Sequence, residues 1–426
     1  MSNTKPTPEQ YLRQAEAELW TSPLIDDNRS DARKTRSVGV IGAGTMGLGI
    51  ATSLLRTGLP VVVVDQSDEA IGRAGGFVEL ALATLVKRGA LTSDDARDCI
   101  GRLKLSTSLD SLADADFVVE AVFERMDVKL AVFAQLGRIL RYDTVIASNT
   151  SSLDIDQLAE TVPNPERVLG LHYFSPAHIS PVVEMIKCAR TSNSVLLEAL
   201  QLCRSSAKKP VVMRTGDSFV ANRLMERYLV ECELMLLEGA LPAQIDGALE
   251  GFGMAMGPLR TFDMAGLDVR YDFMNRPTAR ITTYTDLVAT LTSARRFGQK
   301  NGLGWYRYVN GSRDAIADPV VEELILAEST RKGLKRRILT EHEIVARALL
   351  PIVNEAFEVL DEGLVRRESD IDLLYVFGFG FPKSKGGPLY WAHERGLDRL
   401  ALEAAELKKV HGDRWAMSAL HRHAGA

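Results

Sequence analysis

A glycine-rich segment, Gly42-Ala43-Gly44-Thr45-Met46-Gly47, carries the clearest chemical signal in this 426-residue chain. It follows an apolar run, Ser37–Ile41, and opens a helical stretch that reaches about Thr57. In such a loop the first glycine allows a tight turn, the second lets the backbone approach a pyrophosphate, and the third lets helix and strand pack closely. The N-terminus of the helix adds free N–H groups and the positive end of its dipole. We therefore expect a dinucleotide to be bound by Gly42, Gly44, Thr45, Met46 and Gly47.

An acidic residue stands where such a dinucleotide would present its ribose. The next apolar run, Val61–Val64, ends in Asp65, at about the spacing of 20 residues that this fold uses for an acidic group on the ribose hydroxyls. A 2′-phosphate would be repelled there, and no arginine follows directly, since the next residues are Gln66 and Ser67. The segment predicts NAD rather than NADP. A glycine turn without a ligand is the alternative, and the flanking strand, helix and acidic residue argue against it.

A second group of polar residues follows two later apolar runs. Asn149 and Ser151 come just after Val145–Ala147, and His172 comes just after Val168–Leu171. Open parallel sheets bind ligands beyond the carboxyl ends of their strands. These side chains are therefore expected to project toward the cofactor.

A carboxylate in the strand candidate Pro181–Lys187 is a partner candidate for His172. Period-2 alternation puts Glu184 on the same face as Val182 and Ile186. A carboxylate on an apolar face is costly unless it is paired, and a histidine at a strand end is a suitable partner. Such a carboxylate fixes the imidazole tautomer and stabilises the imidazolium that forms when the histidine takes a proton. The pair could remove the hydroxyl proton of an alcohol whose carbon gives a hydride to the nicotinamide.

These residues also have structural interpretations that their types alone leave open. His172 could be a hydrogen-bonded core histidine, and Glu184 could lie exposed on an edge strand. Ser151 could cap a helix predicted over Leu153–Ala159. The residue types do not decide between the catalytic and the structural interpretation.

The elements that would position these residues form a doubly wound α/β domain up to about residue 213. Its short apolar runs do not alternate with polar residues, as is typical of strands buried on both faces of a parallel sheet, and longer helical stretches separate them. Residues 1–36 are polar and weakly helical around Tyr11–Trp20. Beyond Phe219 the pattern turns helical, with one apolar face formed by Met225, Leu229, Cys232 and Leu236.

Four short segments of the helical part recur in the same order. The first copies are Glu238-Gly239, Ile245-Asp246, Gly257-Pro258-Leu259 and Gly266-Leu267-Asp268, and the second copies are Glu362-Gly363, Ile371-Asp372, Gly387-Pro388-Leu389 and Gly396-Leu397-Asp398. Coincidence among common helix–loop dipeptides is the alternative, but the kept order favours two copies of one helical module. We expect an extension or linker at 1–36, a Rossmann-type NAD-binding domain at 37–215, and all-α modules at 216–310 and 311–426.

Composition and charge argue against several classes of protein. The chain is 46% hydrophobic and 25% charged, as in ordinary globular proteins, and its formal net charge is −5. That near balance argues against a nucleic-acid binder. No apolar run approaches the roughly 18–20 residues of a membrane span. With four cysteines and no metal-type spacing, neither a disulfide framework nor a metal site is expected. The N-terminus lacks the layout of a signal peptide and the C-terminal HAGA is no peroxisomal signal, so we expect a cytoplasmic location.

Taken together, these segments resemble the L-3-hydroxyacyl-CoA dehydrogenase family. The resemblance rests on SVGVIGAGTMGLGIA, DFVVEAVFERMDVK, ASNTSSLDIDQLA, GLHYFSPAHISPVVEMI, DSFVANRLM and GMAMGPLRTFDMAGLD, which span roughly residues 37–400. The repeated module and the connector FGQKNGLGWY look most like the dehydrogenase half of the bifunctional enoyl-CoA hydratase/3-hydroxyacyl-CoA dehydrogenases of β-oxidation. The resemblance implies an NAD-dependent enzyme of fatty acid metabolism that interconverts L-3-hydroxyacyl-CoA and 3-ketoacyl-CoA.

The resemblance also implies roles for single residues. His172 would be the catalytic base and Glu184 its partner. Ser151 would hydrogen-bond the 3-oxygen of the substrate. Asn222, in FVANR, would help to position the reacting groups, although on its own it could be an exposed residue at a helix start. The CoA thioester would bind between the two domains.

Two further residues match cofactor-lining positions of the family. Glu124 and Lys129 would line the nicotinamide-ribose end, whereas the residues alone suggest an exposed helical pair. The family's His-Phe-Phe-Asn-Pro stands here as His172-Tyr173-Phe174-Ser175-Pro176, which puts any role of an asparagine there in doubt. Residues 1–36 are too short for a hydratase domain, so hydratase activity is not predicted.

Other functions and the state of assembly stay open at this point. The same chemistry could act on a specialised or a non-CoA 3-hydroxy acid, and a non-catalytic NAD-binding protein is an alternative of another class. In single-module relatives the helical domains pair between subunits. Two modules in one chain could therefore pair internally, and we expect that a monomer can be complete, with further dimerisation possible.

Overall fold

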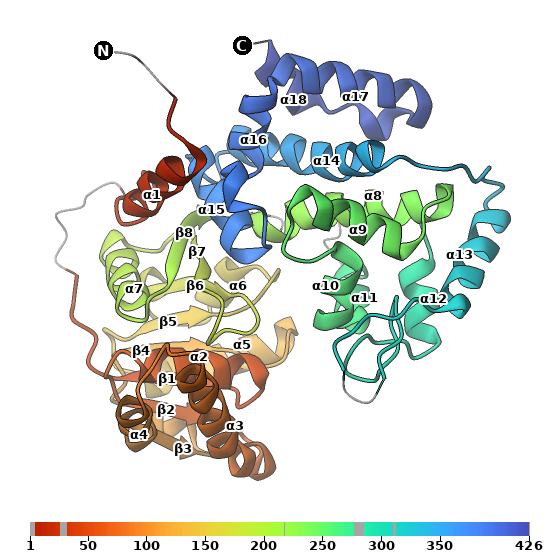
Figure 1. The fold of residues 1–426 in the computed structure, drawn as a ribbon. Helices are drawn as coiled ribbons and strands as arrows, with labels where there is room; N and C mark the ends of the chain where they lie inside the picture. Colours follow the sequence, from red (N-terminus) through yellow and green to blue (C-terminus); the bar gives the residue numbers. More distant parts are fainter. Residues whose placement is uncertain (1–4, 26–31, 217, 277–284, 310–311, 426) are drawn as a thin grey trace. The chain divides into compact units, whose positions relative to one another are not determined.

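The computed structural model describes residues 5–25, 32–216, 218–276, 285–309 and 312–425, which form two compact units (Figure 1). The sheet unit consists of Arg13–Phe219 and Gly363–Gly378. The helical unit consists of Met1–Leu12, Val220–Glu362 and Phe379–Ala426. The two units are treated separately below.

An eight-stranded sheet forms the centre of the sheet unit, in the order β3-β2-β1-β4-β5-β6-β7-β8. Neighbouring strands are parallel except for β6 and β7, which are antiparallel. The strands are β1 Val38–Ile41, β2 Val61–Val64, β3 Leu103–Ser106, β4 Phe117–Glu120, β5 Val145–Ser148, β6 Val168–Tyr173, β7 Val182–Lys187 and β8 Lys209–Arg214. The predicted apolar runs all lie in strands, and their burial on both faces explains why they do not alternate with polar residues.

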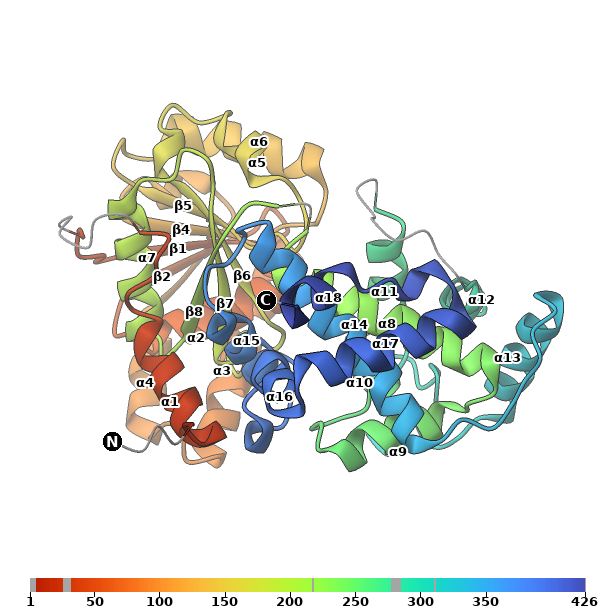
Figure 2. The ribbon, with the colours of Figure 1, turned by 90° about the horizontal axis from the view of Figure 1, so that it is seen from above.

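Helices cover both faces of this sheet. One face packs in a common apolar core against α2 (Thr45–Leu55), α3 (Asp68–Lys87), α4 (Ser93–Gly101) and α7 (Asn193–Ser205). On the opposite face lie α5 (Met126–Ile139) and α6 (Ile155–Ala159) (Figure 2). This arrangement is the predicted doubly wound, Rossmann-like α/β fold.

The described part of the segment before β1 belongs to the sheet unit from Arg13 onward. Helix α1 (Pro8–Glu18) overlaps the stretch Tyr11–Trp20 predicted to be weakly helical, and the side chains of Leu19 and Leu24 after it are buried. Lys187 of β7 donates a hydrogen bond of 2.8 Å to the carbonyl of Leu24. These contacts differ from the expected linker at 1–36, because apolar side chains of that segment pack into the unit.

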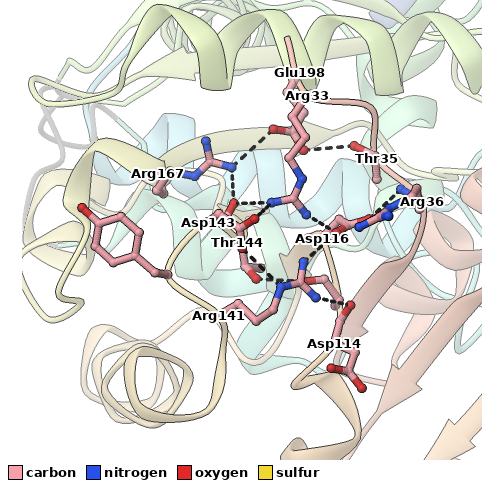
Figure 3. A network of polar contacts seen from close by, with 12 residues as sticks. Arg33, Thr35, Arg36, Asp114, Asp116, Arg141, Asp143, Thr144, Arg167 and Glu198 are labelled. Carbon is pink, nitrogen blue, oxygen red and sulfur yellow. Dashed lines mark hydrogen bonds and ion pairs between the residues drawn. The ribbon is translucent and has the colours of Figure 1, made fainter. Parts of the chain in front are cut away.

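Residues 32–36 are held by charges at the amino ends of β4 and β5 (Figure 3). The guanidinium of Arg33 binds the carboxylates of Asp116 and Asp143. Asp116, which is buried, also accepts bonds from the backbone N–H of Arg36 at 2.7 Å and from Arg141 at 2.6 Å. Arg33 therefore ties the segment to the starts of two central strands.

The helical unit is built around the long helices α8 (Val220–Glu238) and α14 (Glu341–Asp361), which pack along each other (Figure 2). Leu229, Cys232 and Leu236 of the predicted apolar face are buried, and Met225 is half-buried. The other helices are α9 Pro242–Phe252, α10 Pro258–Ala265, α11 Leu267–Met274, α12 Leu287–Ser293, α13 Pro319–Arg331, α16 Pro388–Arg395, α17 Leu397–His411 and α18 Ser418–Ala424. No helix in the described ranges is both long enough and apolar enough to cross a bilayer.

The helices of the expected repeat occur in matching order. Helices α9 and α15 (Glu368–Gly378) each have 11 residues, and α10 and α16 each have 8. Helix α15, however, belongs to the sheet unit, where it packs on β7 and β8. Residues from both expected ranges, 216–310 and 311–426, share the helical unit, and the two ranges stay a prediction.

Candidate functional site

The glycine loop connects β1 to α2, which begins at Thr45 after Gly44. Gly42 has a φ of +102°, and a Cβ on it would lie 2.5 Å from the carbonyl oxygen of Ala121. A Cβ on Gly47 would lie 1.9 Å from the carbonyl oxygen of Gly42, so only hydrogen fits at either glycine. Next to Gly44, by contrast, no atom lies within 4 Å of a Cβ position. The loop is therefore closely packed at both ends and open in the middle.

The carboxylate that follows β2 lies against this loop. Asp65 accepts a hydrogen bond of 2.8 Å from the backbone N–H of Ala43 and one of 2.9 Å from that of Ser67. Thr45 is exposed and Met46 half-buried at the start of α2. The open backbone at Gly44, the helix N-terminus and the nearby carboxylate fit the pyrophosphate and ribose of a dinucleotide.

His172 and Glu184 lie opposite each other in the antiparallel pair of β6 and β7. The distance from His172 Nδ1 to Glu184 Oε2 is 2.7 Å. Glu184 is fully buried, whereas 13% of the His172 side chain is exposed. In a neutral imidazole whose Nδ1 donates to this carboxylate, Nε2 keeps its lone pair. The structure thus brings together the two residues that alternation predicted to be partners. The edge-strand interpretation of Glu184 is wrong, because β7 lies between β6 and β8 and the side chain is buried, whereas the catalytic role of the pair stays a prediction.

A buried lysine binds the connection between β6 and β7. Lys208 donates hydrogen bonds of 2.6 Å to the carbonyls of Ala177 and Ser180. Burial, with Arg56 nearby, lowers the pKa of Lys208 to about 8. Sequence reasoning did not find this residue, because nothing in the sequence places it beneath the connection.

Asn149 joins the carboxyl ends of β5 and β6. Its Oδ1 accepts a hydrogen bond of 2.8 Å from the backbone N–H of Tyr173, the residue after His172. Two residues further along, Ser151 does not cap a helix, because the N-cap of α6 is Asp154. The structural interpretation of Ser151 is therefore wrong.

Ser151 is bound by Glu124, from the loop after β4. The Oε1 atom of Glu124 accepts three hydrogen bonds, from Ser151 N at 2.7 Å, Ser151 Oγ at 2.9 Å and Thr150 Oγ1 at 2.7 Å. Burial acts to raise the pKa of Glu124, but the nearby Lys129 ammonium and these hydrogen bonds outweigh it and lower that pKa. Glu124 is therefore an ionised acceptor that orients Ser151.

Lys129 is not the exposed residue that the sequence alone suggested. Only 1% of its side chain is exposed, and its Nζ lies 2.6 Å from Glu120 Oε1 and 3.5 Å from Glu124 Oε2. Glu120, the last residue of β4, was missed by sequence reasoning. The signal available was an acidic residue at the end of the apolar run FVVE, which needs a buried partner.

Asn222 lies near the start of α8 in the helical unit and is buried. The interpretation of Asn222 as an exposed residue at a helix start is therefore wrong. Its expected part in positioning the reacting groups stays a prediction.

Two models of known protein families match most of the chain. The family described as "3-hydroxyacyl-CoA dehydrogenase, NAD binding domain" matches residues 37–216. The family described as "3-hydroxyacyl-CoA dehydrogenase, C-terminal domain" matches two stretches, residues 219–308 and 344–424.

A curated relative, the "Peroxisomal bifunctional enzyme" of Danio rerio, is 37% identical over 406 residues. The match covers 92% of this chain and 56% of the relative, so the chain spans about half the length of that protein. The expected cytoplasmic location gains no support from this similarity, because the relative is peroxisomal by name.

Two solved structures are similar over most of their length. The 3-hydroxybutyryl-CoA dehydrogenase of Escherichia coli has a TM-score of 0.77 and 28% identity, covering 92% of this chain and 98% of its own. The dehydrogenase part of multifunctional enzyme 1 from C. elegans has a TM-score of 0.72 and 28% identity, covering 97% and 96%.

Proposed function

Because the chain belongs to the 3-hydroxyacyl-CoA dehydrogenase family, whose N-terminal domain binds NAD, we propose that it oxidises L-3-hydroxyacyl-CoA to 3-ketoacyl-CoA and catalyses the reverse reduction. The observation that carries the proposal is the hydrogen bond between His172 and Glu184 at the carboxyl end of β6. That edge of the sheet also holds the glycine loop and Ser151. An acyl-CoA is the proposed substrate.

In the proposed oxidation His172 is the general base. Its Nε2 takes the proton of the 3-hydroxyl group, and the imidazolium that forms is stabilised by the buried carboxylate of Glu184. When bound, NAD would supply the hydride acceptor for carbon 3 of the substrate. In the reverse reduction the same imidazolium returns its proton to the 3-oxygen.

Other residues are proposed to bind and orient the reacting groups. Ser151 hydrogen-bonds the 3-oxygen: its hydroxyl hydrogen turns from Glu124 to the substrate, while its backbone N–H keeps the contact with Glu124. Asn222 helps to orient the substrate. The ribose hydroxyls of NAD are bound by Asp65, and Asn149 keeps the ends of β5 and β6 together at the nicotinamide end.

We further propose that residues 216–310 and 311–426 are two copies of one helical module that pair within the chain. The two separate matches to the C-terminal domain family and the equal lengths of α9 and α15 support this. A monomer would then be complete. Light scattering that gives an obligate dimer, losing activity on dilution, would count against internal pairing.

The test of the proposed activity is the oxidation of NADH by acetoacetyl-CoA, followed by absorbance, with longer 3-ketoacyl-CoAs and free acetoacetate measured alongside. We expect turnover with the thioesters and little with the free acid. His172→Gln is expected to lower kcat by about 10²- to 10⁴-fold, the usual contribution of a general base. The control is His342→Gln, at an exposed histidine of α14. Wild-type protein inactive with every thioester, or a fully active His172→Gln variant, would refute the assignment.

A further inference from the structure

We propose that Lys129 is a positioning residue, which together with Glu120 fixes the Glu124 carboxylate where it binds Ser151. The inference deepens the proposed function, on which the role of Ser151 rests. The side chain of Lys129 is almost wholly buried, and its expected place at the nicotinamide-ribose end of the cofactor site stays a prediction.

The carboxylate of Glu120 has a defined partner at each oxygen. Its Oε1 accepts from Lys129 Nζ at 2.6 Å and from the backbone N–H of Val122 at 2.7 Å. Its Oε2 accepts from the hydroxyl of Ser148 at 2.6 Å. Glu120 and Ser148 are also register partners at the ends of β4 and β5. Glu120 is thus fixed by two strands, and it offers the ammonium of Lys129 a fixed anchor.

The position of Lys129 is unfavourable for an unpaired ammonium. It lies near the start of α5, where the positive end of the helix dipole disfavours a cation, and it is removed from water. A buried ion pair of this kind adds little to stability compared with apolar side chains of similar size. Its location beside Glu124 indicates instead that it fixes the charge and the position of that carboxylate at the edge of the sheet.

The ammonium of Lys129 lies within ion-pair distance of two carboxylates. Besides the 2.6 Å contact with Glu120, its Nζ is 3.5 Å from Oε2 of Glu124. The other oxygen of Glu124 accepts the three hydrogen bonds from Thr150 and Ser151. Without the cation, the attraction that lowers the pKa of Glu124 is lost, so its carboxylate takes up a proton at a higher pH. A protonated Glu124 holds the hydroxyl of Ser151 less firmly.

The test compares Lys129→Met with Lys87→Met, a matched change at an exposed lysine in the last turn of α3. For Lys129→Met we expect kcat with acetoacetyl-CoA and NADH to fall about 10- to 100-fold at neutral pH, as a displaced reacting group would cause. Because Glu124 ionises again at higher pH, the ratio of variant to wild-type kcat should rise with pH. The Kd of NADH, measured by fluorescence, should change by less than about threefold. Lys87→Met should match the wild type in all three.

A second measurement does not depend on turnover. In protein with ¹³C-labelled glutamate carboxylates, Glu124 is assigned by loss of its signal in Glu124→Gln. We expect this carboxylate to titrate at higher pH in Lys129→Met than in the wild type. A double variant, Glu120→Gln/Lys129→Met, removes the facing carboxylate as well and should bring the titration back toward the wild-type pH.

The outcomes separate the two proposals. Wild-type protein that turns over no 3-ketoacyl-CoA refutes the proposed function, while the Glu124 titration still tests the positioning role. An unchanged titration, or a kcat ratio that stays flat with pH, overturns the role of Lys129. A loss confined to NADH affinity, with kcat intact, would assign Lys129 to the cofactor instead.

Discussion

Arg223 on α8 and Arg347 on α14 bind equivalent glutamates on each other's helix. The contacts are those of Arg223 with Glu355 and Glu362, and of Arg347 with Glu231 and Glu238. In both cases the Nε donates a bond of 2.8 Å to the Oε1 of the first glutamate. Reciprocal contacts of this kind are typical of a two-fold axis, at which residue i binds j and j binds i. The pattern supports an internal pairing of two related modules.

Arg347→Met is expected to destabilise the protein strongly. The side chain of Arg347 is fully buried, and its loss leaves the buried Glu231 with the 3.4 Å contact of Arg414; breaking a buried pair of this kind costs about 3–5 kcal/mol. Chemical denaturation followed by circular dichroism measures the free energy of unfolding. Arg223→Met should cost a similar amount if the two arginines are equivalent.

The control for these variants is Arg422→Met, which breaks an exposed ion pair with Asp361. It should cost at most about 1 kcal/mol. If the free energy of unfolding falls by the same small amount in all three variants, the buried contacts contribute no more to stability than a surface pair.

Glu184→Gln is expected to lower kcat by about 10²- to 10⁴-fold while the Kd of NADH stays the same. A glutamine can hydrogen-bond His172 in either tautomer, and it cannot stabilise the imidazolium by charge. Steady-state kinetics with acetoacetyl-CoA measures the effect. The control is Glu160→Gln, at an exposed glutamate that ends α6. A Glu184→Gln variant within about threefold of the wild type would argue against the dyad.

Asp65→Asn is expected to weaken the preference for NADH over NADPH by about tenfold or more. The change removes the negative charge that would repel a 2′-phosphate and keeps an oxygen that can accept from Ala43 N. The ratio of kcat/KM for the two cofactors measures the preference. Asp68→Asn, in the exposed first turn of α3, should leave the ratio unchanged. If both variants keep the wild-type ratio, another residue sets the cofactor preference.

Lys208 is expected to make the stability of the protein rise with pH. Burial and the nearby Arg56 lower its pKa from 10.5 to about 8, so the fold disfavours its charged form. Between these pH values the unfolded chain holds a proton that the folded chain has released. The free energy of unfolding then rises by up to about 1.4 kcal/mol per pH unit between about pH 8 and 10.5, and this gain is lost again as the pH falls from 10.5 to about 8.

Denaturation of Lys208→Met at several pH values tests this. The variant should be less stable throughout, because the carbonyls of Ala177 and Ser180 lose their donor, and it should lack the rise above pH 8. Lys209→Met, at the half-buried neighbouring lysine, should keep the rise. If the free energy of unfolding of Lys208→Met still rises above pH 8, another group causes the rise.

The sequence was sufficient for the parts of the site that depend on local pattern. The order of glycines and the apolar runs before and after them are enough to predict the loop, α2 and Asp65. Alternation along one strand put Glu184 on a buried face, where it needed a partner. The β3 strand, LKLS, was not predicted, because as a half-exposed edge strand it lacks a continuous apolar run.

The remaining parts depend on contacts between segments that are distant in the sequence. The anchoring of Lys129 on Glu120 requires β4, β5 and α5 to be placed, and so the residues alone suggested an exposed pair. The packing of residues 13–25 and 32–36 on the sheet unit includes single contacts such as that of Arg33 with Asp116. No periodic pattern in a polar segment indicates contacts of this kind.

The antiparallel pairing of β6 with β7 decides whether His172 and Glu184 meet at all. Main-chain register, rather than side-chain packing, sets which residue faces His172. A shift of β7 by one residue would turn Glu184 to the other face and leave no carboxylate opposite the histidine. A single deletion in β7 before Glu184 would therefore abolish the pair. The pair depends on the length of the chain between its two residues as well as on their identities.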